Sequence, residues 1–285
     1  MHDLIRIYAG QVTTQPGERQ SARDRLCEHL PILSDAADDH VTALPGTPLP
    51  AEFTSRDEAL AWFDVERATL VAVTSMAAEH GRDDIAHHLP ARLVEYFSWR
   101  RHLDDWLVTA TISKQAATRL RDPHLEAVAL SNYGNVLREL RQFDKAVEVC
   151  QNAVALARST GDRPCEAAAL ANLGLALRHT GQVDEAVRIC SQACDALRRL
   201  GDQRGEARAL NNLGIALYDA DRIEEAGGVH REHLDLGRRT GDHVGEMLAL
   251  VGLGWRPKAS DPSPVQPRRS PHGNRSRRRV FRPFR

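Results

Sequence analysis

Residues 164–203, PCEAAALANLGLALRHTGQVDEAVRICSQACDALRRLGDQ, are the middle of three copies that fill residues 124–243 without a gap. Each copy is 40 residues long, and the copies align column by column. The aligned columns contain leucine (Leu130, Leu170, Leu210), asparagine (Asn132, Asn172, Asn212), glycine (Gly134, Gly174, Gly214) and alanine (Ala146, Ala186, Ala226). A fixed period of this length predicts a stacked repeat architecture, in which each unit buries its apolar face against the next.

The middle copy predicts two helices, Glu166–His179 and Val183–Leu200. The first has leucines at a spacing of three and four residues, which places them on one helical face (Leu170, Leu173, Leu177). Gly181 separates the two helices, and Gly201 ends the second because glycine adopts the left-handed conformation at little cost. We expect the glycine and alanine columns to lie where the paired helices approach most closely.

The series NLGLAL, a turn, VDEAV and a second helix resembles the tetratricopeptide repeat in its longer form. This resemblance implies an all-α fold, a right-handed superhelix of antiparallel helix pairs. The array is expected to span residues 124–254, with three full repeats and a truncated fourth. A degenerate copy precedes it, since Leu103-Asp104 aligns with Phe143-Asp144 at a distance of 40 residues.

The N-terminal 123 residues are expected to form helices before the array. Residues 1–42 predict a helical adaptor with a helix from Pro16 to about His40, which Pro31 would kink or split. Three prolines within 43–55 indicate a linker, and Ser55 fits the N-cap of the next helix. Residues 56–123 are expected to cap the solenoid, with helices from Asp83 to Trp99 and from Leu103 to Leu120.

These N-terminal segments carry a second resemblance. MHDLIRIYA, RLCEHLPILSDAADDHV and DEALAWFDVERATLVA resemble the stretch that joins the winged helix to the tetratricopeptide array in STAND-type (NB-ARC) bacterial regulators. His2-Asp3-Leu4 matches the end of the winged-helix part. The resemblance implies a sensor region of a signalling or transcriptional regulator. The sequence contains no G-x-x-x-x-G-K-[ST] motif, so we expect neither nucleotide binding nor ATP hydrolysis.

Charge is distributed unevenly along the chain. Residues 256–285 contain ten Lys and Arg against one Asp, a charge of +9, whereas the remaining 28 Lys and Arg and 38 Asp and Glu give −10. Segment 255–285 is rich in Pro, Ser and Arg and is predicted to be disordered. Two hypotheses apply to it: attachment to nucleic acid, or a non-functional extension such as a frameshift product, which we favour.

The sequence shows no run of 18 apolar residues and no signal peptide, which predicts a cytoplasmic protein without a membrane span. No arrangement of residues indicates catalysis, and we expect no enzyme, cofactor or metal site. Cys190 and Cys194 share a helical face and permit metal binding in principle, but small buried apolar side chains are the favoured interpretation.

The asparagine column supplies the candidate binding residues. Asn132, Asn172 and Asn212 lie on the first helix of each repeat, which lines the concave groove in tetratricopeptide proteins. A series of amides both donates and accepts hydrogen bonds, as an extended peptide requires. Arg138 and Arg178 follow two of these asparagines by six residues and are predicted to bind a carboxylate. The alternative is that each Asn pairs with neighbouring backbone inside the stack.

Overall fold

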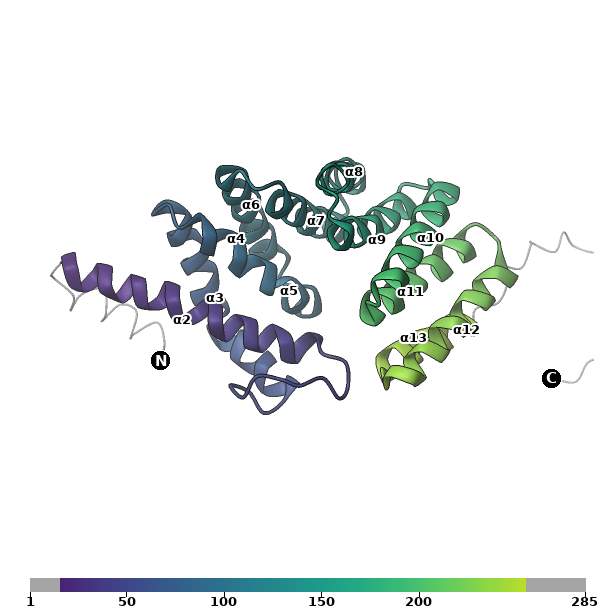
Figure 1. Ribbon diagram of the computed structural model, residues 1–285, viewed down its shortest axis with the longest axis horizontal. Coiled ribbons are helices and arrows are strands. Elements are labelled where there is room, and N and C mark those ends of the chain that lie inside the picture. Colours follow the sequence, from purple (N-terminus) through teal and green to yellow (C-terminus); the bar gives the residue numbers. More distant parts are fainter. Residues whose placement is uncertain (1–15, 255–285) are drawn as a thin grey trace, which may run out of the picture. The chain divides into compact units, whose positions relative to one another are not determined.

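The computed structural model describes residues 16–254, which lie in one compact unit comprising residues 1–255. This part of the chain consists of twelve helices and contains no strand (Figure 1). In chain order they are α2 (Pro16–Thr42), α3 (Arg56–Glu79), α4 (Asp83–Arg92), α5 (Val94–Arg100), α6 (Leu103–Leu120), α7 (Pro123–Glu139), α8 (Phe143–Thr160), α9 (Arg163–His179), α10 (Val183–Leu200), α11 (Gln203–Asp219), α12 (Ile223–Thr240) and α13 (His243–Leu253). The predictions for His2-Asp3-Leu4 and for segment 255–285 lie outside the described residues.

The three copies form three helix pairs, α7–α8, α9–α10 and α11–α12, and α13 begins a fourth. The predicted bounds of α10 are confirmed, and α9 begins three residues earlier than expected. The reason is the N-cap, because the Asp162 carboxylate accepts a hydrogen bond of 3.0 Å from the Cys165 amide. Asp202 and Asp242 cap α11 and α13 in the same way.

A residue in the left-handed conformation occurs every 20 residues from position 81 to position 241. Five of the nine are glycines (Gly81, Gly161, Gly181, Gly201, Gly241) and four are not (Arg101, Arg121, Arg141, Asp221). Each ends a helix or lies in the turn that follows it. The same spacing therefore governs α4 to α6, where the side-chain columns of the repeat are hard to recognise.

The predicted single helix from Asp83 to Trp99 is wrong, because the structure divides it into α4 and α5 at Leu93. Pro90 lacks an N–H donor and its ring crowds the preceding turn, which disfavours a continuous helix. The Leu93 amide instead donates to the Pro90 carbonyl at 3.2 Å, a tighter turn than in an α-helix. In α2, by contrast, Pro31 lies inside one continuous helix.

Elsewhere in residues 16–120 the predicted helices from Pro16 and from Leu103 to Leu120 are present, but the predicted split at Pro31 is wrong. Residues 43–55 contain no helix, and the Ser55 hydroxyl accepts a hydrogen bond from the Glu58 amide at 3.2 Å as the N-cap of α3. α3 packs against α2, α4 and α6. Phe63 of α3 stacks on Tyr96 of α5 with ring centroids 5.0 Å apart, inside an apolar cluster separate from that of the repeats.

The close approach of paired helices occurs at the glycine column, as predicted. A Cβ atom added to Gly134 or Gly174 would overlap the sulfur of Cys150 or Cys190, respectively, on the second helix of the same repeat. In the third repeat, a Cβ atom on Gly214 would overlap the ring of His230. Each repeat therefore uses one glycine to bring its two helices together.

We predict that Gly174→Ala destabilises the fold by about 1–3 kcal/mol, because the added methyl overlaps the Cys190 sulfur. The double variant Gly174→Ala/Cys190→Ala removes that sulfur, and its loss should be smaller than the sum of the two single losses. Urea unfolding of all three variants gives this coupling. Additive losses would show that this contact does not set the helix spacing.

The C-terminal repeat is predicted to unfold locally before the others. Gly227 and Gly228 lie inside α12, and a Cβ atom on either would meet open space. Each glycine costs about 1 kcal/mol relative to alanine in a helix interior. Hydrogen exchange should show weaker protection in α12 than in α8 and α10, and Gly228→Ala should restore it. Equal protection in all three repeats would contradict the prediction.

Candidate binding groove

Two adjoining cavities of about 410 and about 350 Å³ lie between the first helices of the repeats and the N-terminal helices. We call them together the groove. One wall comes from α7, α9, α11 and α13, and the other from the C-terminal end of α2, the residues after it, and α5. Glu95, Arg204 and Arg208 line both cavities. The groove is therefore bounded by segments far apart in sequence.

The repeat determines which side chains face the groove. In α11 the lining positions include Arg204, Arg208, Asn211 and Asn212. They are spaced by i, i+4, i+7 and i+8, which is one face of a helix. The equivalent columns supply Val128, Ser131 and Asn132 from α7, Ala168, Ala171 and Asn172 from α9, and Val244 and Leu248 from α13. The groove face is thus most polar on α11 and apolar on α13.

All three predicted asparagines line the groove. Asn132 and Asn172 lie in the first cavity and Asn212 in the second. The Asn172 amide donates to the Ser131 hydroxyl at 2.8 Å, so part of its hydrogen-bonding capacity joins two repeats. Asn132 and Asn212 are half-buried and have no hydrogen-bond partner among the described side chains and backbone. Their amides are therefore available to a ligand.

The two predicted arginines lie elsewhere. Neither Arg138 nor Arg178 lines the groove. Arg138 pairs with Glu139 at 2.7 Å, and Arg178 lies 3.7 Å from Asp219. A separation of six residues turns a side chain about 240° around a helix with 3.6 residues per turn, away from the asparagine face.

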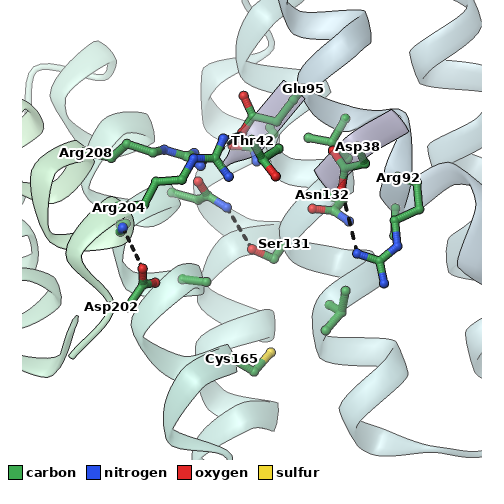
Figure 2. A pocket seen from close by; sticks show the side chains of 18 of the residues that line it. Asp38, Thr42, Arg92, Glu95, Ser131, Asn132, Cys165, Asp202, Arg204 and Arg208 are labelled. Carbon is green, nitrogen blue, oxygen red and sulfur yellow. Dashed lines mark hydrogen bonds and ion pairs between the residues drawn. The ribbon is translucent and has the colours of Figure 1, made fainter. Parts of the chain in front are cut away.

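Two other arginines occupy the groove face, and sequence reasoning missed both. Arg204 and Arg208 extend from α11 towards Glu95 on α5 (Figure 2). Arg208 donates to the Glu95 carboxylate at 3.1 Å, and Arg204 lies 3.4 Å from the same oxygen. The alignment could have indicated both arginines, because they lie eight and four residues before Asn212 and therefore on the same face of the helix. Their partner Glu95 is 113 residues from Arg208, and no local pattern indicates it.

Acidic groups lie on the opposite wall. The Asp38 carboxylate is 3.7 Å from Arg92, the pair joined in Figure 2, and its side chain is 14% exposed. Burial raises its pKa to about 7, although the neighbouring positive charges of Arg92 and Arg204 oppose this effect. The groove therefore contains a carboxyl group that exchanges a proton near neutral pH.

An aromatic side chain lines the second cavity. Trp99 is half exposed, and the Arg56 guanidinium lies over its ring at 3.9 Å from the centroid. Leu44, Leu175 and Leu248 line the same cavity. This part of the groove offers apolar and cation–π contacts, whereas the first cavity offers hydrogen bonds and charges.

The cysteines lie in the core. Cys190 and Cys194 are free and buried, and burial raises the pKa of each thiol to about 12. Within residues 16–254 no group of three or more His, Cys, Asp or Glu is placed to bind a metal ion. The same part of the chain has no helix long and apolar enough to cross a membrane.

Residues 125–199 match the family model of the tetratricopeptide repeat. The chain folds as a tetratricopeptide repeat solenoid. A search of curated proteins finds no match to the sequence. Several solved structures share the fold at low sequence identity.

Three such structures align with two thirds or more of the chain. BtubC (BKLC) from P. vanneervenii has 18% identity and a TM-score of 0.55, covering 66% of this chain and 81% of its own. Aspartyl phosphate phosphatase F from Bacillus subtilis has 14% identity and a TM-score of 0.52, covering 70% of this chain and 51% of its own. A STAND protein with a tetratricopeptide repeat sensor from Pyrococcus horikoshii has 15% identity and a TM-score of 0.53. The alignment covers 69% of this chain and 32% of that protein. At these identities the similarity concerns the fold.

The raised pKa of Asp38 has a consequence for the stability of the solenoid. The folded state binds this proton up to about pH 7, whereas the unfolded chain releases it near the ordinary aspartate pKa of 3.8. Asp38 therefore lowers the free energy of unfolding as pH rises from about 4 to 7, and causes no further loss above that range.

We predict that Asp38→Asn flattens the pH dependence of stability and makes the chain more stable than wild type at pH 8. The gain should be at least about 1 kcal/mol, since one pKa unit corresponds to about 1.4 kcal/mol. Urea unfolding between pH 5 and pH 8 measures it. Glu28→Gln, at an exposed carboxylate on the same helix, is the control and should keep the wild-type profile. Parallel profiles for Asp38→Asn and wild type would contradict the prediction.

Proposed function

We propose that the chain is a protein- or peptide-binding tetratricopeptide repeat module whose ligand lies in the groove as an extended peptide. We further propose that it is the sensor part of a cytoplasmic, STAND-like signalling or transcriptional regulator. The observation that carries the first proposal is the groove face of the repeats. It combines two unoccupied amides, Asn132 and Asn212, with two arginines, Arg204 and Arg208.

The amides match the needs of a peptide backbone. An extended peptide presents N–H and C=O groups at regular intervals, and an asparagine side chain bonds either kind. The first and third repeats hold such groups on one wall, with Asn132 on α7 and Asn212 on α11. Recognition of the backbone is independent of peptide sequence, so we assign specificity to the groove residues that differ between repeats.

The arginines add a preference for acidic ligands. Arg204 and Arg208 are orientated by Glu95, and a carboxylate of the ligand would compete with Glu95 for the same donors. Hydrogen bonds to charged groups contribute about 1.5–3 kcal/mol, which corresponds to roughly a 10- to 100-fold change in affinity. We therefore expect acidic peptides to bind more tightly than neutral ones.

Two observations support the regulatory role. Segment DEALAWFDVERATLVA, which resembles the start of the array in STAND regulators, forms most of α3, directly after the Ser55 cap. A STAND protein with a tetratricopeptide repeat sensor shares the fold. The shared fold supports the proposed sensor role by analogy. The proposed peptide binding is supported by the side chains that line the groove.

Nucleic-acid binding through the Arg-rich segment remains the alternative function. Its basis is the charge of +9 in residues 256–285, which lie outside the described part of the chain. Phosphate binding by these arginines predicts an affinity that falls steeply with salt and is lost when the segment is deleted.

The groove proposal is tested with a phage-displayed library of random peptides about 12 residues long, which span about 40 Å when extended. The full-length chain is the bait, and the affinity of selected peptides is measured by fluorescence anisotropy. We expect enrichment of Asp and Glu and a loss of affinity of 10-fold or more in Arg208→Ala. Asn132→Ala should weaken binding by a smaller factor, because its hydrogen bonds are uncharged.

Arg188→Ala is the matched control, because Arg188 is exposed on α10 and its ion pair within residues 16–254 is with Glu185 of the same helix. It should bind the selected peptides as wild type does. Peptides whose affinity is unchanged by the Arg208 and Asn132 substitutions would place binding outside the groove, and no enrichment at all would also count against the proposal.

A further inference from the structure

One histidine that lines the groove lies where the other repeats have alanine. His233 belongs to α12 and lines the second cavity, although only 1% of its side chain is exposed. At distances of 40 and 80 residues the same column holds Ala193 of α10 and Ala153 of α8, which are fully buried. Alanine therefore satisfies the packing of this column, so packing alone does not account for the imidazole in the third repeat.

The His233 ring has no hydrogen-bond partner within the described residues. Its Nδ1 atom is enclosed and unpartnered. Its Nε2 atom lies beside α13, where a Cβ atom added to Gly245 would be 3.3 Å away, and Gly245 also lines the second cavity. A buried polar group without a partner destabilises the fold. A ligand in the second cavity that bonded to Nε2 would offset part of this cost.

The charge of the ring and its surroundings restricts the group that suits it. Burial lowers the pKa of His233 below its ordinary value of 6.5, although the negative charge of Asp242 opposes this effect. The ring is therefore neutral at neutral pH, with one N–H donor and one acceptor. Asp242 also lines the second cavity and would repel an acidic group there. A neutral hydroxyl, which both donates and accepts, fits this position.

Much of the second cavity is apolar. Its lining includes Leu175 of α9, Ala207 of α11, and Val244 and Leu248 of α13. A ligand side chain that reaches the buried His233 ring through this cavity needs an apolar body with a hydroxyl at its far end. Tyrosine has this form, and its hydroxyl takes a hydrogen-bond partner when the ring is buried. Serine and threonine carry the hydroxyl next to the backbone and lack the apolar body.

We propose that the second cavity binds a tyrosine side chain of the peptide ligand, with the tyrosine hydroxyl hydrogen-bonded to Nε2 of His233. The inference rests on the proposed function, because it assigns one residue of the peptide that the groove binds. Arg204 and Arg208 line both cavities, so the acidic residue that they bind lies near this tyrosine in the ligand. The ligand class is therefore a peptide that combines tyrosine with a nearby aspartate or glutamate.

Parallel selections from the random peptide library test this, with the full-length wild type and full-length His233→Ala as baits. We expect wild type to enrich Tyr, and His233→Ala to enrich it much less. In fluorescence anisotropy, replacing the selected Tyr by Phe should weaken binding to wild type about 2- to 10-fold, because one uncharged hydrogen bond is lost. The same replacement should leave binding to His233→Ala unchanged.

The repeats supply the control variants. His233→Ala introduces the residue that the first two repeats have in this column, and circular dichroism checks that it is folded. His233→Gln keeps a donor and an acceptor and should retain a preference for Tyr. His230→Cys is the matched control, because His230 lies on the same helix, lines neither cavity and has cysteine in its column in the first two repeats. It should prefer Tyr as wild type does.

Two outcomes would overturn the inference while leaving peptide binding in the groove intact. One is equal enrichment of Tyr by wild type and His233→Ala. The other is equal affinity of the Tyr and Phe peptides for wild type. A selection that enriches no peptide at all would instead count against the proposed function and remove this inference with it.

Discussion

The spacing of left-handed residues is the constraint on which the rest of the structure depends. One such residue every 20 positions limits the helices from α6 to α12 to 17 or 18 residues and reverses the chain after each. Because paired helices differ in length by only one residue, Gly174 comes to lie opposite Cys190, and the glycines of the repeats on either side lie opposite Cys150 and His230. One residue inserted into a helix would turn everything after it by about 100°. Insertions of whole repeats would leave the groove columns aligned.

The basic and acidic residues of the groove come from two different parts of the chain. Arg204 and Arg208 come from the array, while Glu95 and Asp38 come from the N-terminal helices. The N-terminal region thus forms the second wall of the groove as well as the cap of the solenoid. The Glu95 carboxylate pairs with both arginines, so a ligand carboxylate that bound them would have to replace these ion pairs. Such competition lowers affinity and sharpens selection for ligands of the right charge.

Sequence reasoning was most successful where a pattern recurs. The period, the two helices of each repeat, the Ser55 cap and the close approach at Gly174 follow from local chemistry repeated in register. The prediction of one helix over Asp83–Trp99 was wrong. Whether a helix that contains a proline is divided depends on the surrounding packing, because α4 ends soon after Pro90 whereas α2 continues past Pro31. For the groove, recurrence indicated the asparagines but not Arg204 and Arg208, which occur in one repeat only. Glu95 could not be found at all from the sequence, because its proximity to them arises only when the chain folds.

The buried thiols make the opening of individual repeats measurable by chemical modification. Cys150 and Cys190 lie at the close contact in the first and second repeats, where burial raises each thiol pKa to about 12 and suppresses the reactive thiolate. Each becomes available to an alkylating reagent only when its helix pair separates. The rate of modification at each cysteine therefore measures how often that repeat opens, and a ligand that bridges neighbouring repeats would slow both rates together.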